Sequence, residues 1–423
     1  MILVPFIFFS LLTAYLWWRH QCFDVCVYMS SLYTFTSLMA IILVIGDLLE
    51  EGGILFDAYD IQLSPIPTLL YCGFITIGIL PFSMLYKKDL NKIATPNPQI
   101  IYCLGWFLIG ISLLNLYLVA DSTLEILSGD LSTIRSDHYK GIESPAEIKA
   151  QSLPYIFRFL YYFNASTLLA LPLFFYYLCF EKRSRWFNTL LFFASLSMPI
   201  AGIQSVDRTE IVFYAMMFLS CLILFNKFLS ERIKRIMKIS LIPICILMVV
   251  YLVAVTDARF SDRRDNGALA YTAEYAGQSY INFCFFWEKA NWDHPTTERI
   301  LPMYNHYVLH IDNDDHRRGV RSGQQGFFMS VFASYIGDIM LDITPIGLFV
   351  WALVFFLITV IVLIRPHREE ISVGDYLVFY TLSAIPIFGI FYYRYMSYPY
   401  SFMLILVAII YTLDRFDFRF SHK

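Results

Sequence analysis

The chain has 423 residues, of which 58% are hydrophobic, 18% are aromatic and only 15% are charged. Its mean hydropathy is +0.59 and its formal net charge is −3. Soluble domains carry about 25% charged residues, so the composition excludes a water-soluble multidomain enzyme, together with disordered, collagen-like and nucleic-acid-binding proteins. It predicts an all-α polytopic membrane protein that forms a single membrane domain.

Eleven apolar runs approach the roughly 20 residues that a helix needs to cross a hydrocarbon core of about 30 Å. They are residues 1–18, 24–48, 64–86, 99–120, 154–180, 187–204, 209–229, 238–256, 344–364, 374–393 and 396–413. The first run has no basic N-terminal region and no Ala-x-Ala cleavage site, so we expect it to be a retained helix. A twelfth segment, residues 326–341, is short, and we expect it to be amphipathic or re-entrant.

The distribution of lysine and arginine orients these runs. With the N-terminus outside and eleven crossings, the inner segments are residues 19–23, 87–98, 181–186, 230–237, 365–373 and the C-terminal tail. These segments and their flanking turns hold more than half of the 31 lysines and arginines. A twelfth crossing would move the arginine-rich tail outside, so we expect eleven crossings and an inner C-terminus.

Two long polar segments, residues 121–153 and 257–324, then lie on the outer side. Long loops in a compact protein are usually functional rather than mere connectors. We therefore expect the two loops to cap an active site at the outer membrane boundary. The cysteines and histidines show no spacing typical of a metal site, so neither a metal nor another cofactor is predicted.

Two arginines lie in tight turns between apolar runs. Arg208 lies in the connection formed by residues 204–210, where a charge is costly and often functional. Its guanidinium can donate paired hydrogen bonds to a phosphate, or it can extend to lipid headgroups or pair with Asp207. Arg394 lies among the tyrosines of residues 392–398, which suit an interfacial aromatic belt or a surface that stacks on sugars.

The large loop contains two charged clusters, residues 257–265 and 310–321. Their candidate functional residues are Arg259, Arg263, Arg264, His316, Arg317, Arg318 and Arg321. Arginines interleaved with carboxylates and imidazoles can bind a diphosphate and supply a general base. A solvated, mutually neutralising charge run is the alternative. Calcium is poorly supported, because the acidic run at 312–315 lacks the glycine and distal glutamate of an EF-hand.

The short segment before the run at 344–364 carries one more candidate. Ser330, Ser334, Gly337 and Asp338 fall at helical spacing on one face. We expect Asp338 to act as a base or as the structural partner of an arginine. Helix packing is the alternative explanation for the small residues on this face.

Taken together, the chain resembles the oligosaccharide repeat unit polymerases, the Wzy-type O-antigen and capsule polymerases of bacteria. The resemblance rests on the apolar runs, on the single large outer loop and on three local motifs. These are residues 274–283 (EYAGQSYINF), the Asp-His-Arg cluster around His316, and residues 330–338 (SVFASYIGD) before Gly347. The chain departs from one branch, because no outer-face arginine is followed eleven residues later by glycine. The His-x9/10-Gly-type motif of the related ligases is not clearly present.

The resemblance implies a glycosyltransferase of the bacterial inner membrane. One undecaprenyl-diphosphate-linked glycan would be transferred to the terminal sugar of another on the periplasmic face, without a cofactor and with undecaprenyl diphosphate as leaving group. The partners implied are this glycan donor and acceptor, membrane lipid and a possible chain-length regulator, but no nucleic acid.

The resemblance also distributes the site residues between two roles. The implied catalytic residues are Arg208, Asp338 and His316, and the implied diphosphate- and glycan-binding residues are Arg259, Arg263, Arg264, Arg317, Arg318, Arg321, Arg394, Glu274 and Gln278.

Three other functions are alternatives. An O-antigen ligase, or another polyprenyl-phosphate-dependent glycosyltransferase, would use the same donor with a different acceptor, and the sequence discriminates poorly between the two. A flippase for lipid-linked sugars, or another transporter, predicts charges at mid-membrane depth, and the long outer loop disfavours it. A membrane scaffold without enzymatic activity would leave the clustered arginines unexplained.

Overall fold

A computed structural model describes most of the chain. The described residues are 1–45, 63–85, 89–128, 145–181, 183–204, 209–237, 239, 268–292, 296–310, 322, 329, 331–364 and 369–421. Apart from residue 239, the predicted span at 238–256 therefore lies outside the described residues, as does much of the two predicted outer loops.

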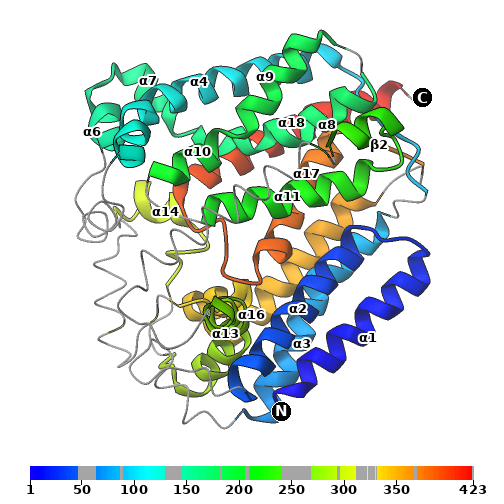
Figure 1. Cartoon of the computed structure of the whole chain (residues 1–423), viewed down its shortest axis with the longest axis vertical. Coiled ribbons are helices and arrows are strands. Elements are labelled where there is room, and N and C mark those ends of the chain that lie inside the picture. The colour runs from blue at the N-terminus through cyan, green and yellow to red at the C-terminus, as the bar shows by residue number, and fades with distance from the viewer. Residues whose placement is uncertain are drawn as a thin grey trace. The chain divides into compact units, whose positions relative to one another are not determined.

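Within the described residues the chain is mainly helical, with two short strands (Figure 1). The elements are α1 (Leu3–His20), α2 (Val25–Ile45), α3 (Pro65–Ile79), the 3₁₀ helix η2 (Leu80–Met84), β1 (Lys92–Ala94), α4 (Pro98–Ser128), α6 (Pro145–Ser152), α7 (Tyr155–Tyr161), the 3₁₀ helix η3 (Asn164–Leu169), α8 (Ala170–Cys179), α9 (Arg185–Ser195), α10 (Ser197–Gln204), α11 (Thr209–Phe225), α13 (Ala268–Lys289), α14 (Pro302–Tyr307), α16 (Ser334–Leu363), β2 (Glu370–Ser372), α17 (Val373–Phe388) and α18 (Tyr398–Ser421).

Several of these helices are long and apolar enough to cross a membrane. Among the described residues four meet this condition, namely Val25–Ile45, Pro65–Met84, Pro98–Ala120 and Ser334–Leu363, and the bent pair Tyr155–Tyr161 with Asn164–Cys179 adds a fifth if it is one span. These helices support the coarse prediction of an all-α membrane protein. The eleven crossings and their orientation stay predictions.

The chain divides into two compact units. The first comprises Met1–Asn91, Asp265–Ile371 and Val378–Ser401, and the second comprises Lys92–Arg264, Ser372–Leu377 and Phe402–Lys423. The boundaries therefore pass through α17 and α18. Whether the units act as the single membrane domain expected from the sequence stays a prediction.

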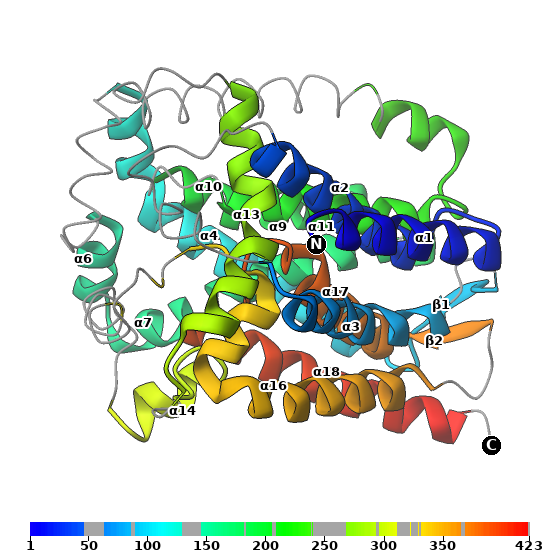
Figure 2. The ribbon, with the colours of Figure 1, turned by 90° about the horizontal axis from the view of Figure 1, so that it is seen from below.

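In the first unit α2 packs against α1 and α13, and α1, α2 and α3 lie side by side (Figures 1 and 2). The close approach of α13 to α2 depends on Gly277, because a Cβ there would lie 2.6 Å from the backbone nitrogen of Ala40. Buried aromatic rings fill the space between these helices, and Phe9 lies 5.5 Å from Tyr33. Lipid tails are as apolar as these rings, so close van der Waals packing rather than removal of apolar surface from water holds the helices together.

Helix α16 is broken near its first third. Ile343 and Thr344 have non-helical backbone angles, with φ of 69° at Thr344, and Pro345 follows. In a straight helix, at about 1.5 Å per residue, Tyr335 and Trp351 would be about 24 Å apart along the axis, yet their rings lie 5.9 Å apart. The part before the break, residues 334–342 (the short half), and the part after it, residues 345–363 (the long half), therefore fold towards each other (Figure 2). The break separates the predicted short segment at 326–341 from the predicted span at 344–364.

The short first half of α16 is joined to the end of α17. The amides of Ser334 and Tyr335 donate to the carbonyls of Phe391 and Gly389, at 3.0 and 2.9 Å. The first amides of a helix have no partner within the helix, and these carbonyls supply partners from outside it. The residues that follow α17 are thereby held beside the start of α16.

In the second unit α4 packs against α9, α10 and η3. Phe187 of α9 fills the space beside Gly105 of α4, where a Cβ would lie 2.6 Å from the Phe187 ring. Asn115 Nδ2 donates to Ser197 Oγ at 2.7 Å and so connects α4 with α10. The helices of this unit are thus held by close aromatic packing and by a buried polar pair.

Candidate functional site

Four of the predicted site residues, Asp338, Arg394, Glu274 and Gln278, are described by the structure, and all four belong to the first unit. The others lie outside the described residues: Arg208, His316, Arg259, Arg263, Arg264, Arg317, Arg318 and Arg321. The part of the candidate site that the structure describes therefore consists of these four residues and their contacts.

Asp338 lies at the centre of a buried polar cluster. Its side chain is buried on the short half of α16, and its Oδ1 forms an ion pair with Nη1 of Arg299, which is itself buried. Its Oδ2 accepts a hydrogen bond from the backbone N–H of Tyr393 at 2.7 Å. One carboxylate therefore joins the large loop, α16 and the turn between α17 and α18.

Asp342 lies four residues later on the same helix and is fully buried. Its Oδ2 accepts hydrogen bonds from the backbone N–H groups of Arg299 and Ile300, at 2.6 and 3.1 Å. Its Oδ1 accepts from the Thr296 hydroxyl at 2.9 Å, and its backbone carbonyl accepts from the Thr296 N–H at 2.6 Å. Residues i and i+4 lie on one face of a helix, so the two aspartates together hold residues 296–300 against α16.

Arg394, like Arg299, is buried, and only 5% of it is exposed. Its Nη1 donates to the Tyr392 hydroxyl at 3.1 Å, and its Nη2 donates to the Tyr400 hydroxyl. The guanidinium carbon also lies 4.7 Å from the centre of the Tyr400 ring and 5.5 Å from that of Phe388. Contacts of this kind with aromatic rings stabilise a desolvated cation by about 2 kcal/mol or more.

More aromatic rings are stacked around this turn. The Tyr392 ring stacks on Phe332, with 6.0 Å between the ring centres and 14° between the planes. The His306 ring stacks on Tyr398, at 4.9 Å and 10°. The aromatic turn predicted around Arg394 is thus an extended set of rings, and both earlier interpretations, an interfacial belt and a sugar-stacking surface, remain compatible with it.

Gln278 and Glu274 lie on α13. Gln278 is buried, and its Oε1 accepts a hydrogen bond from Asn282 Nδ2 at 3.3 Å. Asn282 Nδ2 also donates to the carbonyl of Phe332 at 2.9 Å, which ties α13 to the aromatic set. Glu274 lies one turn before Gln278 and is partly exposed. The contacts of Gln278 favour a role in holding the site over direct binding of glycan.

The same helix carries Cys284, which lies outside the predicted membrane-spanning runs. Burial raises the pKa of its thiol to about 12. A thiol becomes nucleophilic only as the thiolate, and at neutral pH this cysteine is therefore protonated. The face of α13 that lies in the core thus supplies structure rather than a cysteine nucleophile.

We refer to Arg299, Asp338, Asp342 and Arg394 as the Arg–Asp cluster. Both carboxylate oxygens of Asp338 already accept hydrogen bonds, which favours its role as structural partner of an arginine over its role as a base. Arg299 and Asp342 were not singled out from the sequence. The spacing of Asp338 and Asp342 could have suggested a shared helix face, but nothing in the sequence pairs either aspartate with Arg299.

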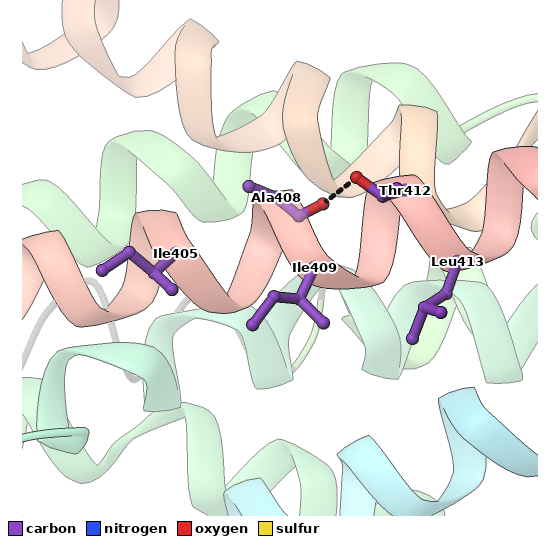
Figure 3. Close-up of a pocket in the computed structure, with 5 residues that line it drawn as sticks. All are labelled: Ile405, Ala408, Ile409, Thr412 and Leu413. Atoms are coloured by element: carbon purple, nitrogen blue, oxygen red, sulfur yellow. Dashed lines mark hydrogen bonds between the residues drawn. The ribbon is translucent and has the colours of Figure 1, made fainter.

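The second unit has a hollow on α18 with a different character. Its lining residues are Ile405, Ala408, Ile409, Thr412 and Leu413 (Figure 3). The Thr412 hydroxyl donates to the backbone carbonyl of Ala408 at 2.8 Å, and the other four side chains are apolar. This hollow offers apolar contact and no charged group, so we do not assign phosphate or proton-transfer chemistry to it.

Comparison with known proteins found no matching family model, no matching curated protein and no matching solved structure.

Proposed function

We propose that the chain is a glycosyltransferase that polymerises undecaprenyl-diphosphate-linked oligosaccharide repeat units into O-antigen or capsular polysaccharide on the periplasmic face of the inner membrane. The resemblance in sequence suggests this reaction. The observation that supports it best is the Arg–Asp cluster, because its residues come from three segments for which the sequence predicts the same outer side. These are the large loop, the short half of α16 and the turn between α17 and α18.

The proposed reaction breaks the bond between the anomeric carbon of the donor and a diphosphate oxygen, and it forms one glycosidic bond. A hydroxyl of the acceptor sugar attacks the anomeric carbon of the donor, and the bond from that carbon to the diphosphate oxygen breaks. The electron pair leaves with undecaprenyl diphosphate, and a general base takes the proton of the hydroxyl. Arginine side chains oriented towards the diphosphate would stabilise the charge that develops on it.

In this proposal the two described arginines have different roles. Arg299 is held by Asp338 and by the Asp342 contacts to its backbone, so it secures the loop. Arg394 is buried and donates to two tyrosine hydroxyls, so in this proposal it orients the aromatic set of the turn towards the donor glycan. His316 is the expected base, and Arg208 and the loop arginines are the expected further phosphate ligands; all of them lie outside the described residues.

The proposal is tested first in cells. We expect deletion of the gene to leave surface glycan with a single repeat unit, and the wild-type gene to restore a ladder of longer chains on a gel. Arg394→Ala and Arg208→Ala should each abolish the ladder at unchanged protein level. The matched control is Arg232→Ala, which removes an exposed arginine on the predicted inner side. A normal ladder from both outer-side variants would contradict the proposed site.

A further inference from the structure

We propose that residues 301–309, here called the α14 segment, dock onto the outer interface of the lipid bilayer. The large loop was predicted from its charge to be a polar outer loop. The geometry points instead to a part of that loop that lies on the membrane, in contact with lipid headgroups and the first carbons of the acyl chains. This inference does not depend on the proposed glycosyltransferase activity.

The side chains of the α14 segment are the first observation. Leu301, Tyr304, Tyr307, Val308 and Leu309 are each between 43% and 58% exposed, whereas Pro302 and Asn305 are buried. Residues 300–311 contain no Asp, Glu, Lys or Arg, although the loop on both sides of them is rich in charge. Exposed aliphatic side chains combined with tyrosines are typical of segments that lie in a membrane interface.

The long half of α16 defines where the membrane boundary lies. Its exposed apolar residues recur at helical spacing and form one stripe: Ile346, Phe349, Val350, Leu353, Val354, Leu357, Ile358 and Ile361. A stripe of this kind on a span-length helix faces lipid. From Pro345 to Leu363 the helix is about 28 Å long at about 1.5 Å per residue, which matches a hydrocarbon core of about 30 Å. Pro345 therefore lies close to one boundary of the core.

The α14 segment is tied to that boundary by buried hydrogen bonds. Asp342, three residues before Pro345, binds the backbone of Thr296, Arg299 and Ile300. Asn305 then ties α14 to the same turn, because its Nδ2 donates to the carbonyls of Thr297 and Leu301 at 2.6 and 3.0 Å. The segment is thus attached to the end of the lipid-facing helix, and its exposed apolar side chains lie at the depth of the interface.

Other occupants fit this surface less well. A glycan binds to flat rings and polar groups, but three of the five exposed residues, Leu301, Val308 and Leu309, are aliphatic. A partner protein would require a feature that specifies it, and the surface has none beyond its apolar character. Bilayer lipid requires only apolar contact at the correct depth. The exposed side chains supply the contact, and the hydrogen bonds to Asp342 fix the depth.

The test measures depth with nitroxide spin labels on the full-length protein in lipid nanodiscs. Single cysteines carry the label at Val308 or at Tyr304, in a variant whose native cysteines are replaced and which retains the elution profile of the parent. Ile358→Cys on the lipid-facing stripe is the deep control, and Glu231→Cys at an exposed charged position is the aqueous control. Collisions with oxygen report lipid, and collisions with a water-soluble nickel chelate report solvent.

We expect both α14 labels to be more accessible to oxygen than to the nickel chelate, at a depth between the two controls and close to the phosphate level. Accessibility to the chelate equal to that of the Glu231 label would overturn the proposal, because the segment would then be in water. Protection from both reagents would overturn it as well, because protein or glycan would then cover the surface. Two label sites keep the test decisive if one substitution disturbs the fold.

Discussion

At the scale of single residues, two aspartates on one helix face act in different ways. Asp338 binds a guanidinium and one backbone amide, whereas Asp342 accepts hydrogen bonds from backbone amides and from the Thr296 hydroxyl. Removal of one member of a buried ion pair leaves an uncompensated charge and costs about 3–5 kcal/mol. Loss of both charges together costs less, because no unpaired charge remains.

This difference predicts non-additive effects at Arg299 and Asp338. Arg299→Gln and Asp338→Asn should each lower the melting temperature of the purified protein markedly, and the double variant should be more stable than the sum of the two losses implies. Thermal unfolding of the four proteins in one detergent measures the coupling. Strictly additive losses would mean that the two side chains do not interact in the folded protein.

At the scale of helices, the sequence predicted several elements well and missed others for identifiable reasons. The apolar runs at 24–48, 64–86 and 99–120 correspond to α2, to α3 with η2, and to the first part of α4. The run at 374–393 was predicted too long, since α17 ends at Phe388 and the carbonyls of Gly389 and Phe391 bind the first amides of α16 instead.

Helix α13 was not predicted as a helix within the large loop. Its polar residues Gln278, Ser279 and Asn282 lie in the segment interpreted as a polar outer loop, yet all three are buried and hydrogen-bonded. The partners of Ser279 and Asn282 are backbone carbonyls 111 and 50 residues away in the chain. Contacts at such separations are set by the fold, and for the same reason the sequence pointed to Asp338 but not to Arg299.

The crossing of α13 and α2 gives a prediction at this scale. Gly277→Ala should lower the stability of the protein by about 1–3 kcal/mol, because the added methyl group must push the two backbones apart. Gly73→Ala is the matched control in the same unit, since a Cβ on this α3 glycine has nothing within 4 Å. We expect the control to be neutral or slightly stabilising. Equal destabilisation by both substitutions, in the same thermal assay, would argue against the close crossing.

At the scale of the whole molecule, the membrane-crossing helices organise the chain, and the predicted orientation places the proposed chemistry. The helices of the structure could cross the membrane in either direction. The orientation is therefore predicted from the distribution of lysines and arginines in the sequence. The turn that carries Arg394 and the loop that carries Arg299 are both on the outer side only if the number of crossings between them is even.

The orientation can be measured with C-terminal fusions. With eleven crossings and an outer N-terminus, we expect a green fluorescent protein fused after Lys423 to be fluorescent and an alkaline phosphatase at the same point to be inactive. A second pair of fusions at Asn291, in the large loop, should give the opposite result. An active phosphatase at the C-terminus would reverse the predicted orientation of the last helices and move the turn at Arg394 to the inner side.

The proposed glycan polymerisation is tested most directly with the purified protein in liposomes that contain an undecaprenyl-diphosphate-linked repeat unit and no added cofactor. We predict a ladder of products spaced by one repeat, release of one undecaprenyl diphosphate for each linkage formed, and loss of both in the Arg394→Ala protein. A single transfer that occurs only when an acceptor other than the lipid-linked repeat unit is added would identify a ligase instead. Movement of the lipid-linked sugar across the bilayer with no new glycosidic bond would contradict the proposed reaction.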